Sequence, residues 1–461
     1  MERLFGTSGI RGLIDVDLTP ELSIKIGLAA AKFYGEGARI LVGRDHRPHA
    51  RVIELGLISG LLAGGVNVIE AGVAPTPAIL WALLHLDADG AIVCTGSHTP
   101  PEIVGILFFK KDTSELDRGE EERFERIMRK ESFDRVPWNR VGSLECVDIT
   151  DIYIESVLRM IKTSIGGRIV VVDPGNGVAS GVLRALLERA GVDVVAINDT
   201  PDPRFPRRDP FPRPENLKRL GQIVRGIGAD LGVATDGDGD RAIFVGEDGS
   251  IYWGDISGAL LAMDAIKYRN TKDIVVTVNT SSIVEIVVKR LGGRVHYCDV
   301  GPPSIAARMK EVNAGFGLEE SGKYIWSDAI YYGDVALATI RMLELLEREG
   351  KTISELVSEL PRRTLTKTAI SCPNSIKNQV TEYVYRRIRD IWKEKPCKIL
   401  RIRNGFKVLY EDGSWVLFRP SGTEPKYRIH AEACDEKIAQ KLLERGIRIV
   451  RNAIRTLAGL Y

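Results

Sequence analysis

Short apolar runs alternate with longer amphipathic stretches along most of the chain. Runs such as residues 40–42 and 91–94 have the length and composition of buried strands. Between such runs, apolar side chains recur three and four positions apart. Residues 19–33 show this spacing, which indicates a helix with one buried face that begins at Thr19. Because strands and helices alternate, the pattern predicts parallel or mixed sheets covered by helices.

The alternation predicts three α/β units followed by a region with a different pattern of secondary structure. The three units are expected at residues 1–147, 148–250 and 251–365. Residues 366–461 contain short strands, a helix, a hairpin-like segment and a terminal helix, which indicates a smaller α+β domain. No fixed sequence period links the first three units, so a repeat among them is a structural hypothesis.

Composition and charge are those of a soluble globular protein. Of the 461 residues 44% are hydrophobic, and 64 Lys and Arg against 62 Asp and Glu leave a formal charge of +2. A chain this apolar is expected to fold rather than remain disordered. So small a net charge provides no overall field for nucleic acid. No long apolar run predicts a membrane span, and the first residues lack a signal-peptide core, so we expect a cytoplasmic protein.

The six cysteines and six histidines give no support for a metal site with nitrogen or sulfur ligands. Neither a Cys-x-x-Cys pair nor a His-Glu-x-x-His motif occurs. The cysteines are interpreted as buried thiols, and any metal is expected to have oxygen ligands.

The sharpest local signal is the run Asp236-Gly237-Asp238-Gly239-Asp240-Arg241 between two predicted strands. Three carboxylates at alternate positions can converge on one cation, because the glycines let the backbone curl. The run therefore predicts an oxygen-only site suited to Mg²⁺. One alternative is an EF-hand calcium loop with Glu247 at its last position, although Arg241 stands where that loop requires glycine. The other alternative is an acidic surface turn.

Ser97 lies in a loop, residues 95–101, that follows a buried strand and contains two prolines. The prolines stop the chain from entering a helix directly, so the loop displays Ser97. No Gly-x-Ser-x-Gly motif is present, and in an extended loop His98 would point away from Ser97. Considered alone, Ser97 is interpreted as a turn residue rather than as a nucleophile.

Two further loops carry side chains suited to a phosphorylated sugar. Residues 419–428 combine two hydroxyls, a glycine and flanking arginines, which suits a phosphate because the guanidinium fork matches its oxygens. A solvated hairpin turn is the alternative. In residues 317–323, Glu319 and Ser321 could bond neighbouring sugar hydroxyls, but acidic loops flanked by glycine are also common on surfaces.

With these loops in this order, the chain resembles the α-D-phosphohexomutase family, which includes phosphomannomutase/phosphoglucomutase and phosphoglucosamine mutase. The resemblance covers essentially the whole chain. Besides the loops above, it includes residues 5–12, Gly43-Arg44-Asp45 and Ala74-Pro75-Thr76-Pro77. It implies three related α/β domains with mixed sheets and a C-terminal α+β domain, arranged around a central cleft to which each contributes one loop.

The resemblance also implies roles for individual residues. Ser97 would be a phosphoserine, and Asp236, Asp238 and Asp240 would bind one Mg²⁺ together with the phosphate on Ser97. Arg241 would neutralise phosphate charge, and His98 and Arg11 would assist near the reacting phosphate. The sugar and its second phosphate would be held by Glu319, Ser321, Lys323, Arg419, Ser421, Gly422, Thr423 and Arg428.

The expected function is intramolecular phosphoryl transfer between the 1- and 6-positions of mannose or glucose, through hexose 1,6-bisphosphate, which would also serve as activator. The alternatives are a phosphoglucosamine mutase, a metal-dependent sugar phosphatase and a non-catalytic sugar-phosphate-binding protein. The partners would be small hexose phosphates, with no nucleic acid and no membrane, and the protein would be a monomer or homodimer.

Several positions depart from the family pattern. Leu107 and Asp299 stand where lysines are usual, and Lys323 stands where histidine or glycine is usual. Lys110, Lys111 and Lys323 are the candidates to restore the lost positive charge. These departures bear on the choice of sugar and on the rate of turnover.

Overall fold

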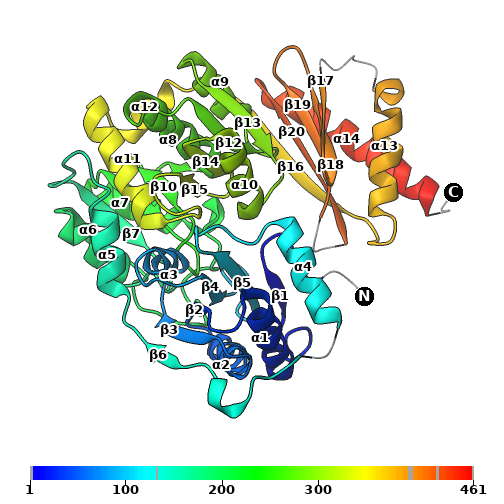
Figure 1. Cartoon of the computed structure of the whole chain (residues 1–461). Helices are drawn as coiled ribbons and strands as arrows, with labels where there is room; N and C mark the ends of the chain where they lie inside the picture. The colour runs from blue at the N-terminus through cyan, green and yellow to red at the C-terminus, as the bar shows by residue number, and fades with distance from the viewer. Residues whose placement is uncertain (1–3, 131–132, 393–397, 422–424, 459–461) are drawn as a thin grey trace.

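The computed structural model describes residues 4–130, 133–392, 398–421 and 425–458. Within these residues the chain forms four β-sheets, one after another along the sequence, and each packs against helices (Figure 1). The described residues contain no helix that is long and apolar enough to cross a membrane.

The first sheet has six strands in the order β1-β5-β4-β2-β3-β6. Strands β2, β3 and β4 are parallel, whereas β5 returns antiparallel to β4. Thr19 caps the first helix by accepting from the Leu22 amide at 3.2 Å, which confirms the predicted helix start. The elements are β1 (Ile10–Leu13), α1 (Pro20–Tyr34), β2 (Arg39–Arg44), α2 (Pro48–Ala63), β3 (Asn67–Val73), α3 (Thr76–Leu83), β4 (Gly90–Cys94), β5 (Ile103–Lys110), α4 (Arg118–Arg129), η1 (Trp138–Arg140) and β6 (Leu144–Cys146).

The second sheet has five strands in the order β11-β10-β9-β7-β8. Its two central parallel strands, β7 and β9, are nearly continuous apolar runs, as expected for strands buried on both faces, whereas the edge strand β8 is partly exposed. The elements are α5 (Thr150–Leu158), β7 (Ile169–Asp173), α6 (Val182–Arg189), β8 (Asp193–Ala196), η2 (Pro214–Asn216), α7 (Lys218–Ile227), β9 (Leu231–Ala234), β10 (Ile243–Gly246) and β11 (Ile251–Tyr252).

The third sheet has four strands in the order β13-β12-β14-β15. Five helices belong to this unit, and α11 is buried along most of its length against the other two units. The elements are α8 (Gly254–Tyr268), β12 (Asp273–Thr277), α9 (Ser282–Arg290), β13 (Arg294–Cys298), α10 (Pro302–Val312), β14 (Phe316–Glu319), β15 (Lys323–Trp326), α11 (Val335–Glu349) and α12 (Ile353–Ser358).

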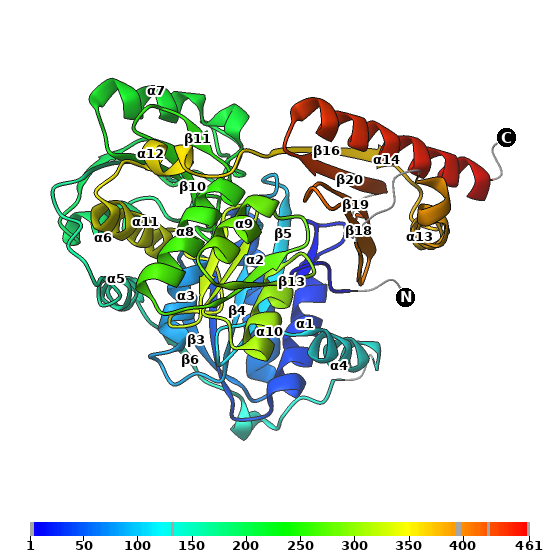
Figure 2. The same cartoon turned by 90° about the horizontal axis from the view of Figure 1, so that it is seen from above.

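The fourth sheet is antiparallel throughout, in the order β16-β20-β19-β18-β17. Figure 2 shows β16 carrying the chain from α12 into this sheet. One face packs against α13 and α14, and the other turns toward the third unit through Val278, Trp415 and Leu417. The elements are β16 (Thr364–Ser371), α13 (Lys377–Ile391), β17 (Lys398–Ile402), β18 (Gly405–Leu409), β19 (Trp415–Pro420), β20 (Lys426–Ala433) and α14 (Glu436–Leu457).

The first three sheets share one strand pattern. Each contains the order second-first-third-fourth, seen in β3-β2-β4-β5, β8-β7-β9-β10 and β13-β12-β14-β15. In each, the first three strands are parallel and the fourth returns antiparallel to the third. The predicted fold class, with three related α/β domains of mixed sheets, is confirmed. The repeat lies in the topology, which explains why no sequence period reveals it.

This pattern places the predicted functional loops at equivalent points. The Ser97 loop joins β4 to β5, the aspartate loop joins β9 to β10, and the Glu319 loop joins β14 to β15. Residues 419–428 likewise include the ends of two adjacent antiparallel strands, β19 and β20. One large core contains residues of the first three units, such as Leu41, Val170 and Ile274, so these units pack as one body.

Local sequence sets the ends of two helices in the first unit. Helix α4 begins at Arg118, because Asp117 caps it and completes a capping box with Glu120. Helix α3 ends at Leu83, and the chain then turns through Asp87, whose φ is 44°.

The cysteines also differ in part from expectation. Cys94 and Cys372 are buried, but Cys146 and Cys434 are exposed. Cys146 lies on the edge strand β6, whose three residues are all exposed, and Cys434 follows the end of β20. Cys397 lies outside the described residues.

Candidate active site

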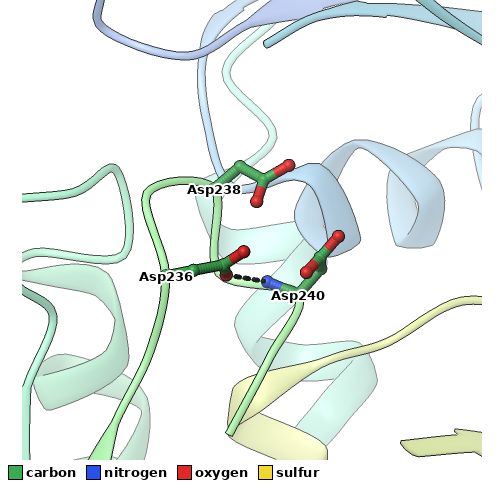
Figure 3. A group of neighbouring side chains, drawn as sticks. All are labelled: Asp236, Asp238 and Asp240. Carbon is green, nitrogen blue, oxygen red and sulfur yellow. Dashed lines mark hydrogen bonds between the residues drawn. The ribbon is translucent and has the colours of Figure 1, made fainter. Parts of the chain in front are cut away.

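The three aspartates of the loop between β9 and β10 turn toward one point (Figure 3). Asp236, Asp238 and Asp240 each offer a carboxylate oxygen, and these oxygens lie within 4.8 Å of one another. All three side chains are buried. The surface-turn alternative is therefore wrong. The EF-hand alternative is wrong as well, because antiparallel strands flank the loop and Glu247 accepts from Ser354 instead.

Backbone amides from three domains hold this loop in shape. The carbonyl of Gly237 accepts from the Val178 amide at 3.1 Å, and the carbonyl of Asp238 accepts from the Thr76 amide at 3.0 Å. The next carbonyl, of Gly239, accepts from the Val335 amide at 3.2 Å. Thr76 and Val335 are the first residues of α3 and α11, so the N-termini of two helices lie against the backbone of the aspartate loop.

The carboxylates fit a divalent metal ion. Asp238 Oδ1 and both Oδ atoms of Asp240 are buried without a hydrogen-bond partner in the described structure. Burial, with Asp240 and Asp238 beside it, raises the pKa of Asp236 well above its usual range. Burial, with Asp240, raises the pKa of Asp238 to about 6. Asp240 is paired with Lys323 and Arg241, so these two cations offset part of the repulsion. A bound cation would relieve the rest and give Asp238 Oδ1 a partner.

Ser97 is buried against this triad. Its Oγ donates to Asp236 Oδ2 at 3.0 Å. Its φ is 50°, a left-handed conformation that costs a non-glycine residue about 1–3 kcal/mol. The turn brings His98 Nδ1 to 3.2 Å from Ser97 Oγ, so the prediction that His98 points away is wrong. That prediction assumed an extended loop.

Arg47, which the sequence analysis missed, binds the backbone of the serine loop. Its Nη2 donates to the carbonyls of Ser97 at 3.2 Å and Thr99 at 2.7 Å. Its charge is balanced by Asp45, which also accepts from the Gly96 amide at 2.9 Å. The motif Gly43-Arg44-Asp45, only two residues earlier, was the signal that could have pointed to it.

Arg241 lies between the triad and the serine loop. Its Nε is 3.4 Å from Asp236 Oδ2 and 3.7 Å from Asp240 Oδ1, and its Nη2 is 3.2 Å from His98 Nδ1. Burial, together with the charge of Arg241, lowers the pKa of His98 well below its usual range, so the imidazole is neutral. The ring of Phe211, another residue missed by the sequence analysis, covers both Arg241 and His98.

Arg11 lies on β1, opposite Gly105 of β5. Its charge helps to lower the pKa of His98, which places it within electrostatic reach of the serine loop. Beside it, Glu115 is buried and accepts from Ser8 Oγ at 2.9 Å, and burial raises the pKa of Glu115 to about 7. Glu115 was missed because its position in a charged stretch suggested a solvated helix.

The Glu319 loop is joined directly to the aspartate loop. Lys323 Nζ lies 2.7 Å from Asp240 Oδ2, and the Gly322 carbonyl accepts from the Ala242 amide at 2.9 Å. Ser321 donates to Glu319, and both side chains are buried.

Of the three lysines that could restore the lost charge, the structure brings Lys323 to the triad. Lys110 pairs with Glu120 at 3.0 Å, and Lys111 lies 3.5 Å from Asp87 on the surface. Leu107, where a lysine is usual, is fully buried in the apolar core.

The fourth domain contributes a pair of arginines. Arg419 and Arg428 are cross-strand partners on β19 and β20. Burial and the charge of Arg428 lower the pKa of Arg419, while Glu319 and Asp299 oppose that shift. Arg419 is therefore within electrostatic reach of the Glu319 loop. Ser421 is held by Lys377, whose Nζ donates to its carbonyl at 2.8 Å.

Two predicted phosphate-binding residues, Gly422 and Thr423, lie outside the described residues. The other predicted site residues fall into one group around Ser97 and the triad and a second group around Arg419. The Glu319 loop lies between the two groups.

A serine held against a buried carboxylate triad and flanked by a guanidinium group is suited to phosphoryl transfer. Comparison with known proteins identifies the class of enzyme. The chain matches four domains of phosphoglucomutase/phosphomannomutase: the alpha/beta/alpha domains I, II and III over residues 2–135, 151–249 and 253–364, and the C-terminal domain over residues 372–451. The chain belongs to the phosphoglucomutase/phosphomannomutase family and is an enzyme of the phosphohexomutase class.

Individual relatives cover the whole chain. A phosphoglucomutase/phosphomannomutase of Thermococcus kodakarensis is 38% identical over 462 residues, which is 99% of this chain and 100% of the relative. A phosphoglucosamine/phosphogalactosamine mutase of Sulfurisphaera tokodaii is 35% identical over 457 residues, 98% of this chain and 99% of the relative. A solved family member from Burkholderia thailandensis has a TM-score of 0.86 at 28% identity, covering 98% of each chain.

Proposed function

We propose that the protein interconverts hexose 1-phosphate and hexose 6-phosphate, with mannose, glucose or both as the sugar. The observation that carries this proposal is the position of Ser97 Oγ, 3.0 Å from Asp236 and beside Arg241. Family membership supports the same reaction class. The partners are small hexose phosphates, and hexose 1,6-bisphosphate is the intermediate and activator.

The proposed reaction transfers a phosphoryl group from phosphorylated Ser97 to the free 1- or 6-hydroxyl of the sugar phosphate. The bond between phosphorus and Ser97 Oγ breaks, the bond to the sugar oxygen forms, and the hydroxyl proton of the sugar ends on Ser97 Oγ. The bisphosphate then turns over, and its other phosphoryl group returns to Ser97. The bond between phosphorus and the sugar oxygen breaks, the bond to Ser97 Oγ forms, and the serine proton ends on the sugar oxygen. His98 is neutral, and its Nδ1 lies 3.2 Å from both Ser97 Oγ and Arg241 Nη2, so it would help to position the serine hydroxyl, whose proton is donated to Asp236.

The charged residues would serve the two phosphates differently. Asp236, Asp238 and Asp240 would hold one Mg²⁺ together with the phosphate on Ser97, and bound Mg²⁺ would neutralise charge on the transferring group. Arg241 and Arg11 would stabilise the same charge from the protein side. Arg419, Arg428 and Ser421, with Gly422 and Thr423, would bind the phosphate that does not react. Glu319, Ser321 and Lys323 would bind the sugar in either orientation.

We further propose that domains divide at residues 147/148, 250/251 and 365/366, and that the enzyme acts in the cytoplasm as a monomer or homodimer. The first and third proposed domains each contain one complete sheet, which supports this division. Strand β11 extends the second sheet to Tyr252, and β16 of the fourth sheet begins at Thr364, so both strands cross the proposed boundaries by two residues.

A phosphoglucosamine mutase is the alternative, and the name of the Sulfurisphaera tokodaii relative favours it. A substrate panel decides between the two. The purified protein is incubated with Mg²⁺, a trace of hexose 1,6-bisphosphate and the 1-phosphate of mannose, glucose or glucosamine, and the 6-phosphate is measured. Product from none of these sugars would overturn the mutase proposal. Stoichiometric release of inorganic phosphate would instead indicate a phosphatase.

Intact mass spectrometry tests the phosphoserine. We expect a protein carrying one phosphoryl group that is absent, together with the activity, in Ser97→Ala. Ser59→Ala, on the exposed face of α2, is the matched control and keeps both. A fully active Ser97→Ala variant would contradict the assignment.

A further inference from the structure

Lys323 is a buried lysine at the junction of two functional loops. It is the first residue of β15, and its side chain is only 4% exposed. Its Nζ lies 2.7 Å from Asp240 Oδ2 and donates to Tyr332 Oη at 3.2 Å. The same ammonium group lies 4.5 Å from the centre of the Tyr332 ring. A lysine that loses this much hydration requires a strong anionic partner.

The backbone places Lys323 against the sugar side of the site as well. Lys323 and Glu319 are cross-strand partners in the β14–β15 hairpin, so their side chains lie on the same face. The hairpin is joined to the aspartate loop by the hydrogen bond from the Ala242 amide to the Gly322 carbonyl. Lys323 therefore has the proposed sugar loop on one side and the proposed metal loop on the other.

The contact with Asp240 places the ammonium group where a cation would bind. Among the described residues, Asp240 is the ion-pair partner of Lys323 within 4.0 Å. Asp240 Oδ2 has no hydrogen-bond partner of good geometry, so the contact is essentially a pairing of charges. An ammonium group and a divalent cation repel each other, and both would be drawn to this carboxylate. Lys323 thus opposes the entry of a metal ion as long as it stays at Asp240.

A phosphorylated sugar changes this balance. A sugar held at Glu319 with its phosphate directed toward the hairpin would offer the ammonium group a doubly charged partner other than Asp240. Movement of the Lys323 side chain toward that phosphate would free Asp240 Oδ2. Conversely, a metal ion at Asp240 would weaken the pull of Asp240 on Lys323 and release the ammonium group for the phosphate.

We propose that Lys323 couples the affinity of the aspartate loop for a divalent cation to the affinity of the Glu319 loop for a phosphorylated sugar. The inference rests on the proposed function, because it takes a sugar phosphate as the ligand of that loop. Coupling between two sites is reciprocal, so each ligand strengthens the binding of the other by the same factor. Lys323 acts here as a positioning residue between the sites.

The test uses Mn²⁺ as the metal probe and xylose 1-phosphate as the sugar probe, since this sugar lacks the 6-hydroxyl that would be phosphorylated. Calorimetry measures the Mn²⁺ affinity of the full-length protein with and without saturating sugar. In the unchanged protein we expect the sugar to strengthen Mn²⁺ binding about fivefold or more. In Lys323→Met we expect tighter Mn²⁺ binding without sugar, and a sugar effect below about twofold.

Two further variants complete the test. Lys323→Arg keeps the charge and should keep most of the coupling. Lys367→Met is the matched control, since this lysine pairs with Glu320 of the same hairpin at 3.2 Å, and it should behave like the unchanged protein. If the methionine variant does not fold, Lys323→Gln provides the same neutral comparison.

The outcomes separate this inference from the proposed function. If xylose 1-phosphate binds but Lys323→Met shows unchanged Mn²⁺ affinity or unchanged coupling, the inference about Lys323 is wrong and the mutase proposal stands. If xylose 1-phosphate and the hexose phosphates of the substrate panel all fail to bind the unchanged protein, both are overturned.

Discussion

The aspartate loop and the β19–β20 hairpin each gather side chains of one charge, but they do so in different ways. In the aspartate loop, three carboxylates are buried within a turn whose carbonyls are bound by three domains. In the hairpin, Arg419 and Arg428 are half-buried neighbours on a regular antiparallel sheet within one domain. The aspartate loop is irregular and is fixed by hydrogen bonds from three domains, whereas the arginine pair follows from strand register alone.

The difference reflects the size of the proposed ligands. A small cation requires oxygens that converge within a few ångströms, which a regular strand does not provide because its side chains alternate between faces. A phosphate is broad enough to accept two guanidinium groups from adjacent strands. In both places like charges are held together before a ligand arrives, so the repulsion is part of the folded protein and is relieved by binding.

The largest effect is expected at the aspartate loop. Asp238→Asn removes one charge from the triad without creating a cavity, and should lower kcat by at least about 100-fold. Steady-state kinetics and Mn²⁺ calorimetry check this. Asp248→Asn, in an exposed turn of the same domain, is the matched control and should be fully active. Near-normal kcat at limiting Mg²⁺ would remove Asp238 from the proposed metal site.

A smaller effect is expected at the hairpin. Arg419→Ala removes one of two guanidinium groups, so kcat/KM should fall about 10- to 100-fold, mainly through KM. The effect should extend to kcat if this contact also positions the reacting end of the sugar. Arg401→Ala, on the edge strand β17, is the matched control. Unchanged kinetics with both the 1- and the 6-phosphate would contradict the proposed phosphate site.

The smallest expected effect is on stability and concerns His430, which lies on β20 near the arginine pair. Burial lowers the pKa of His430 to about 3, helped by the charges of Lys367 and Arg419. The unfolded chain binds a proton near pH 6.5 and the folded chain does not. His430 therefore stabilises the fold above pH 6.5, and this contribution is lost as the pH falls from 6.5 toward 3.

Denaturant unfolding at pH 7.5 and 5.5 measures this contribution. Between the two pH values, the unchanged protein should lose about 1.4 kcal/mol more free energy of unfolding than His430→Leu. His85→Leu, at an exposed turn position two residues after the end of α3, is the control and should behave like the unchanged protein. Inorganic phosphate should raise the pKa of His430, followed by NMR, because it adds negative charge beside the imidazole. Equal pH dependence in all three proteins would show that the pKa of His430 is not lowered in the folded protein.

The sequence predicts those features of the two regions that depend on residues close together in the chain. The aspartate run and the arginines around the 419–428 turn are close in the chain, so spacing alone indicates their chemistry. Alternating apolar runs likewise predict most strands and the change to an α+β pattern near residue 366. Strand β5 was not predicted, because its nearly continuous apolar run follows the proline-containing loop without a clear turn signal.

Contacts between distant segments could not be predicted in this way. Arg47 holds the Ser97 loop from a position 50 residues earlier. Phe211 reaches His98 from the second domain. The approach of His98 to Ser97 depends on one left-handed residue, and periodicity does not predict that conformation for a serine.

The three amides that bind the aspartate loop have a consequence for the order in which the protein becomes active. They belong to residues 76, 178 and 335, so the last of them is synthesised almost a hundred residues after the loop itself. A nascent chain that ends before residue 335 has made all three aspartates, but not the helix that completes their support. The phosphoryl-transfer centre therefore forms late in synthesis, after the third domain has folded onto the first two.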